Sequence, residues 1–144
     1  MTTFNMLIVD DSYSMRAVIR KIIGLSGFKV DQCYEAQNGI EALDVLSKHW
    51  VDVILSDINM PEMNGIDLLK RLKEDNLYKD IPVVFVTTEG SKERIMEAEQ
   101  AGANGFLKKP FLPEELRHIL YHLVGLTDEG EYGTEGTEND TGDF

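Results

Sequence analysis

The sequence has few cysteines, few histidines and no apolar run long enough to cross a bilayer. A single cysteine, Cys33, excludes an internal disulfide and is typical of a reducing compartment, so we expect a cytoplasmic protein. The apolar residues 6–9 are followed at once by two acids, which is not the pattern of a signal peptide. Membrane insertion is therefore not expected.

Basic residues are also scarce. There are 14 Lys and Arg against 26 Asp and Glu, which gives a formal net charge of −12. Seven acids and no base fall in residues 127–144, so residues 1–126 retain −5. Neither part offers a basic surface for nucleic acid or for an anionic membrane. We predict one folded domain, residues 1–126, and a disordered acidic tail, residues 127–144.

Short apolar runs alternate with helical patterns along residues 1–126. Apolar residues recur at one-face helical spacing after each run, for example Met15, Val18, Ile19, Ile22 and Ile23. Ser12 or Asp11 is suited to cap that first helix. Five strands that alternate with five helices indicate an α/β fold, in which helices cover both faces of a parallel sheet.

Apolarity ranks the five predicted strands. Residues 5–9, the run that ends at Asp57, and residues 82–87 are nearly all apolar, as central strands are. Residues 29–34 are more polar, and the predicted strand at 105–107 is short, as is typical of strands at sheet edges. We therefore expect the doubly wound, flavodoxin-like (βα)5 sheet with strand order 2-1-3-4-5, and a crevice between strands 1 and 3.

The strands that point at this crevice end in reactive side chains. Strand 1 is followed by Asp10 and Asp11, strand 3 by Asp57, strand 4 ends at Thr87, and strand 5 leads to Lys109. A lone Asp after a strand is more often a turn cap, but the whole set at one edge is hard to explain as caps. Two carboxylates about 5 Å apart repel by about 3 kcal/mol at an effective dielectric of about 20. Oxygen ligands without His or Cys favour Mg²⁺ or Mn²⁺, and such a site can hold a phosphoryl group in line with Asp57.

These residues resemble a known family. Asp10-Asp11, Asp57 in a Ser-Asp-Ile-Asn-Met-Pro-x-Met-Asn-Gly context, Thr87 and Lys109-Pro110 are similar to the receiver domain of bacterial two-component response regulators, over residues 4 to about 125. The stretch Asp10-Asp11-Ser12-x-Ser14-Met15-Arg16 is most similar to single-domain chemotaxis (CheY-like) regulators.

The resemblance implies a role for each matching residue. Asp57 is expected to be the phosphoacceptor, with Asp11, Asp57 and the backbone carbonyl of Asn59 binding Mg²⁺ and Asp10 acting through a water. Thr87 is expected to hydrogen-bond the phosphoryl group, Lys109 to pair with it, and the Lys109–Pro110 bond to be cis.

The resemblance also implies how the switch works. Thr87 and an aromatic residue at position 106 are expected to move together and to change the surface of helix 4, strand 5 and helix 5. Phe106 stands where the chemotaxis proteins usually have Tyr, so a contact that needs a hydroxyl is in doubt. Asn59 and Glu89 are expected to tune the lifetime of the phosphoryl group.

The expected function is a phosphoacceptor switch and not an enzyme acting on other molecules. A histidine kinase or phosphotransfer protein is the expected donor, and a downstream protein, such as the flagellar motor switch, is the expected target. The alternative is a relay intermediate or a regulator of another protein. A monomer is expected, with dimerisation on phosphorylation left open.

Three rival interpretations are disfavoured by particular residues. A haloacid-dehalogenase-type phosphatase needs a second Asp where Asn59 stands, and an FMN site would meet repulsion from Asp10 and Asp11. His118 and His122 have a zinc-compatible spacing but lack a third ligand.

Overall fold

A computed structural model describes residues 3–125. These residues form a five-stranded parallel sheet with five helices. The strands are β1 (Phe4–Val9), β2 (Val30–Ala36), β3 (Val53–Ser56), β4 (Val83–Thr87) and β5 (Gly105–Lys108). The helices are α1 (Tyr13–Ser26), α2 (Gly39–Lys48), α3 (Gly65–Lys73), α4 (Lys92–Gln100) and α5 (Pro113–Val124). The strand order is β2-β1-β3-β4-β5, which confirms the predicted topology and both edge strands.

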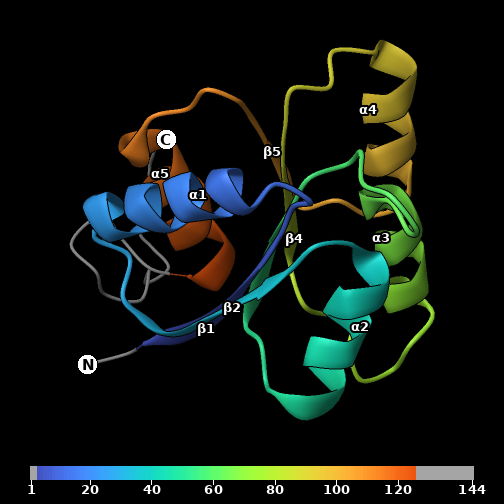
Figure 1. Cartoon of the computed structure of the whole chain (residues 1–144), viewed down its shortest axis with the longest axis horizontal. Helices are drawn as coiled ribbons and strands as arrows, with labels where there is room; N and C mark the ends of the chain where they lie inside the picture. Colours follow the sequence, from blue (N-terminus) through green and yellow to red (C-terminus); the bar gives the residue numbers. More distant parts are fainter. Residues whose placement is uncertain (1–2, 126–144) are drawn as a thin grey trace.

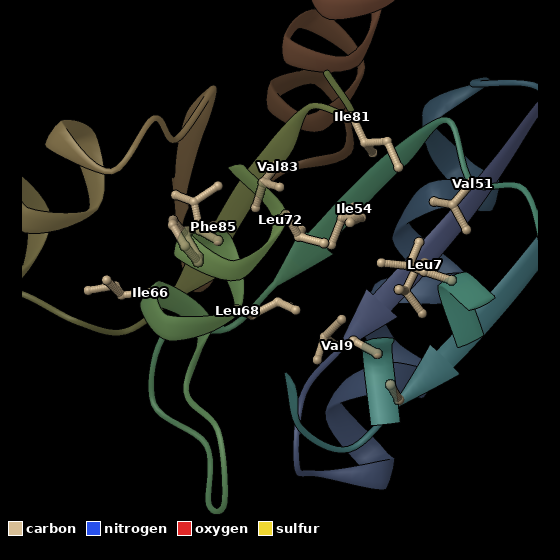
Figure 2. Packing of buried hydrophobic residues seen from close by; sticks show 14 of the residues in the cluster. Leu7, Val9, Val51, Ile54, Ile66, Leu68, Leu72, Ile81, Val83 and Phe85 are labelled. Atoms are coloured by element: carbon tan, nitrogen blue, oxygen red, sulfur yellow. The ribbon is translucent and has the colours of Figure 1, made fainter. Parts of the chain in front are cut away.

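Helices cover both faces of the sheet, with α1 and α5 on one side and α2, α3 and α4 on the other (Figure 1). Alternate residues of each strand face opposite sides, so β1 sends Met6 and Ile8 toward α1 and α5, and Leu7 toward α2 and α3. Figure 2 shows the side of the sheet that α2, α3 and α4 cover, with Leu68 and Leu72 of α3 close to the sheet. Burial on both faces explains why the central strands are almost entirely apolar.

Short polar side chains begin four of the helices. The side chains of Ser12, Asn38, Asn64 and Ser91 accept hydrogen bonds from backbone N–H groups in the first turns of α1 to α4. The cap of α1 is thus Ser12 rather than Asp11. Gly27, with φ of 83°, ends α1 in a left-handed conformation that glycine adopts without strain.

One apolar residue in each of α1 and α2 shows that apolar helix positions are not all buried. Val18 of α1 and Ile40 of α2 have exposed fractions of 48% and 53%. In α1 the stripe that contacts the sheet is centred on Ile19 and Ile23, and Val18 lies about 100° away from Ile19 around the helix. The other margin of that stripe holds the buried side chain of Arg16, which the apolar pattern did not predict.

Within residues 3–125 no helix is both long and apolar enough to span a membrane. The predicted acidic tail, residues 127–144, lies outside the described residues.

Candidate functional site

The pairing of β1 with β3 places Asp10 beside Asp57. Val9 is the partner of Ser56 across these strands, and the N–H of Asp57 donates to the carbonyl of Val9 at 2.8 Å. Each acid is the first residue after its strand, so both side chains leave the sheet at the same edge. Asp10 is only 2% exposed, a burial that needs compensation for its charge.

Asp11 completes a cluster of carboxylates, which we call the carboxylate cluster: Asp10, Asp11 and Asp57. One carboxylate oxygen from each of the three lies within 4.8 Å of the others. At that separation each pair of charges repels by about 3 kcal/mol for an effective dielectric of about 20. The arrangement therefore favours a nearby cation.

Lys109 supplies one such cation from the segment that follows β5. Its Nζ atom donates to Oδ2 of Asp10 at 2.8 Å and to Oδ2 of Asp57 at 3.3 Å. Burial acts to lower the pKa of Lys109, but the hydrogen bonds and charges of Asp10 and Asp57 outweigh it and raise that pKa above its ordinary value. The side chain therefore stays protonated at neutral pH.

The charges of the site suit a divalent cation. Three carboxylates and one ammonium leave two negative charges at the edge of the sheet. The donors are all carboxylate oxygens, which are hard ligands that suit Mg²⁺ or Mn²⁺ rather than zinc. The residues present therefore fit the predicted metal.

Thr87 ends β4 and is hydrogen-bonded to Glu89 in the following loop and to the backbone of Lys109. Thr87 is 3% exposed, its Oγ1 accepts from the N–H of Glu89 at 3.1 Å, and its carbonyl accepts from the N–H of Lys109 at 2.9 Å. These bonds place the hydroxyl next to the segment that bears the ammonium.

Asn59 lies on the exposed side of the site, in the loop after β3. Its Nδ2 donates to Oε1 of Glu89 at 3.1 Å, so the β3–α3 and β4–α4 loops are joined by a side-chain hydrogen bond. The N–H of Ser91 and the amide of Asn59 both bind the Glu89 carboxylate and lower its pKa. The two residues predicted to tune phosphoryl lifetime thus contact each other.

Both the side chain and the backbone carbonyl of Asp57 have close neighbours. The N–H of Ile58 donates to Oδ1 of Asp57 at 2.7 Å, and Oγ of Ser56 donates to the Asp57 carbonyl at 2.8 Å. Gly65 packs so closely that a Cβ atom there would collide with the same carbonyl oxygen. Asp57 is thereby fixed in place at the end of its strand.

Phe106 lies half-buried in β5, with its ring centroid 5.9 Å from that of Phe85. It packs against the core on the α2, α3 and α4 side of the sheet. The Lys109–Pro110 peptide bond is cis, as the family resemblance implied.

The structure brings together Asp10, Asp11, Asp57 and Lys109, with Thr87 adjacent through backbone hydrogen bonds. Ser56, Gly65 and Arg16 support the site through contacts that the sequence pattern did not indicate. The close approach of Gly65 to Asp57 depends on how the start of α3 packs against the end of β3.

Comparison with known proteins gives a consistent result. The family model described as the response regulator receiver domain matches residues 6–121. The chain is 41% identical over 131 residues to the "Chemotaxis protein CheY homolog" of Campylobacter jejuni, covering 90% of this chain and 98% of that protein. It is 40% identical over 124 residues to "Chemotaxis protein CheY1" of Helicobacter pylori, covering 85% and 98%.

Solved structures agree with the sequence comparisons. The chemotaxis response regulator CheY4 of Vibrio cholerae superimposes with a TM-score of 0.72 at 38% identity, covering 85% of this chain and 99% of that one.

Proposed function

Because this chain belongs to the response regulator receiver domain family, we propose that it is a phosphorylation switch with Asp57 as phosphoacceptor. One observation supports this assignment above the others. The three carboxylates gather within 4.8 Å at the end of β1 and β3, and the Lys109 ammonium contacts two of them. The Asp57 carboxylate accepts from the N–H of Ile58, and its backbone carbonyl accepts from Oγ of Ser56 and lies against Gly65, which suits a nucleophile that must stay aligned.

The reaction begins with a phosphohistidine on a histidine kinase or a phosphotransfer protein. A carboxylate oxygen of Asp57 attacks the phosphorus, a new O–P bond forms, and the P–N bond breaks with its electron pair returning to the imidazole nitrogen. Mg²⁺, held by Asp11, Asp57 and the Asn59 carbonyl, with Asp10 acting through a water, would supply Lewis-acid stabilisation of the phosphoryl oxygens.

The other residues stabilise the product. Lys109, already protonated between Asp10 and Asp57, pairs with the phosphoryl oxygens, and the Thr87 hydroxyl donates to one of them. Water later attacks the phosphorus, the O–P bond to Asp57 breaks, and inorganic phosphate leaves. The protein thus promotes its own phosphorylation and dephosphorylation and acts on no other substrate.

The output is a change of surface. When the Thr87 hydroxyl turns to the phosphoryl group, Phe106 turns further inward and the surface of α4, β5 and α5 binds a downstream protein. The named similarity to chemotaxis proteins of three bacteria favours a chemotaxis-type regulator whose target is the flagellar motor switch. The relay-intermediate alternative is not favoured by these relatives.

Labelling with a small phosphodonor tests the assignment. Intact-mass spectrometry with acetyl phosphate and Mg²⁺ should show one added phosphoryl group on the wild type and none on Asp57→Asn. Asp44→Asn, a change of the same kind at an exposed helical position, is the matched control and should label normally. An Asp57→Asn protein that labels as fully as the wild type would refute the assignment.

A further inference from the structure

Arg16 is a buried arginine in the first turn of α1, with a side chain only 10% exposed. Its Nη1 atom donates to the backbone carbonyl of Asp10 at 2.6 Å, and its Nε atom donates to Oε1 of Glu35 at 2.7 Å. The ring of Tyr13 lies over the same guanidinium, 5.6 Å from Cζ. The guanidinium therefore has several partners at once, and its fixed fork defines where the Asp10 carbonyl lies.

Glu35 orients this arginine from the carboxyl end of β2. Its second oxygen accepts from Nη1 of Arg20 at 3.0 Å, so the carboxylate is held between two arginines. β2 also binds the Asp10 peptide directly, because the N–H of Asp10 donates to the carbonyl of Ala36 at 3.0 Å. Both the N–H and the carbonyl of Asp10 are therefore fixed, one by β2 and one by Arg16.

The charge of Arg16 does not account for this arrangement. Its hydrogen bond toward the cluster goes to a backbone carbonyl, and Glu35, which Arg16 shares with Arg20, offsets part of the guanidinium charge. The carbonyl that Arg16 holds belongs to the peptide that joins Asp10 to Asp11. A shift of that peptide would move both carboxylates relative to Asp57.

We propose that Arg16 is a positioning residue for the carboxylate cluster: its guanidinium, oriented by Glu35, holds the Asp10 carbonyl and so fixes the Asp10–Asp11 turn in the geometry that binds a divalent cation. The inference rests on the Mg²⁺-dependent function proposed above. Residues that orient metal ligands typically change metal affinity by about 10-fold to 100-fold when replaced.

Two substitutions distinguish the positioning role of the Arg16 guanidinium from an effect of its positive charge. Arg16→Gln removes the guanidinium, whereas Arg16→Lys keeps the positive charge. The ammonium of the lysine variant is attracted to Glu35. It lacks the planar set of donors with which the guanidinium binds Glu35 and the Asp10 carbonyl together. Arg20→Gln is the matched control, because it removes the other arginine on Glu35 and leaves the Arg16–Asp10 hydrogen bond in place.

Isothermal titration calorimetry with Mg²⁺ alone measures the effect, with circular dichroism used to choose a temperature at which every variant is folded. Both Arg16 variants should raise the Mg²⁺ Kd by about 10-fold, and Arg20→Gln should change it by less than about twofold. Labelling by acetyl phosphate should need correspondingly more Mg²⁺, with its rate at saturating Mg²⁺ nearly unchanged. If Arg16→Gln does not fold, the Arg16→Lys result decides.

Wild-type Mg²⁺ affinity in Arg16→Lys would overturn the proposal, because charge alone would then suffice. Equal weakening in the Arg16 variants and Arg20→Gln would also overturn it, since that pattern would reflect general loosening of the ion pairs. A wild-type protein that binds no Mg²⁺ would refute the proposed function, and the inference with it.

Discussion

The ammonium of Lys109 lies 2.8 Å from the buried carboxylate of Asp10, although the two residues are 99 positions apart in the chain. The side chains are 11% and 2% exposed, so each charge depends on the other for compensation. Removing one partner of such a pair leaves the other buried and unpaired, which is costly.

Lys109→Met should lower the free energy of unfolding by about 3 kcal/mol in the absence of divalent cations. Urea unfolding measures this change. Millimolar Mg²⁺ should recover part of the loss, since a divalent cation replaces the missing positive charge. Lys48→Met is the control, because its exposed pair with Asp44 should contribute less than about 0.5 kcal/mol. Equal losses in the two variants would contradict the importance of burial.

Asp11→Asn should stabilise the protein when no divalent cation is present. Asp11 is exposed and repels Asp10 and Asp57 within the cluster, so neutralising it removes repulsion. A gain of up to about 1 kcal/mol is expected for a charge so open to solvent. The stabilisation that Mg²⁺ gives the wild type should shrink in the variant. Thermal unfolding with EDTA and with Mg²⁺ measures both effects, and a less stable Mg²⁺-free variant would contradict the account.

Gly65→Ala should destabilise the protein and slow labelling of Asp57. The added methyl group would collide with the Asp57 carbonyl and with the Phe85 ring, at a cost of about 2 kcal/mol. Gly24→Ala is the matched control, since it lies in α1 with open space around it and should gain about 0.5 kcal/mol from helix propensity. Denaturant unfolding of both variants checks the prediction, and an unaffected Gly65→Ala protein would contradict it.

Cys33 should react slowly with thiol reagents near neutral pH. Burial raises the pKa of this thiol above its ordinary value of 9.0, with Arg20 lowering it and Glu35 raising it to smaller degrees. The rate of alkylation by iodoacetamide should therefore reach half its maximum above pH 9.0. A half-maximal rate below that pH would contradict the burial.

The same shift has a consequence for stability. The folded state favours the neutral thiol. Its contribution to the free energy of unfolding is therefore present below pH 9.0 and is lost as the pH rises through the higher pKa of the folded state. Cys33→Ala should show a weaker decline of stability in that range.

Truncation after residue 126 should leave the melting temperature within about 2 °C of the full chain. All the core residues described here precede that point, and Gly125 already ends α5. Differential scanning calorimetry makes the comparison. A drop much larger than this would show that residues 127–144 contribute to the folded domain.

Much of this architecture could be predicted because strand apolarity reports position in a parallel sheet. The polar β2 and the partly exposed β5 lie at the edges, and the ends of β1 and β3 bring Asp10 beside Asp57 as expected. Each strand's apolarity can be read from its own residues, and the usual winding of such sheets then places the strand ends together.

Contacts between distant segments were harder to foresee. The helical pattern marked Val18 as apolar, yet the face of α1 that meets the sheet leaves Val18 exposed and buries Arg16. The reason that Arg16 can be buried is Glu35, which lies 19 positions away on β2. Likewise, the close packing of Gly65 on Asp57 depends on the path of the β3–α3 loop.

The most direct test of the account is to locate the phosphoryl group in the wild-type chain. Borohydride reduces an acyl phosphate but not a free carboxylate, so reduction after labelling with acetyl phosphate and Mg²⁺, followed by peptide mass spectrometry, marks the acceptor. We expect a reduced side chain at Asp57 and none at Asp10 or Asp11. Modification at another acid, with Asp57 intact, would contradict it.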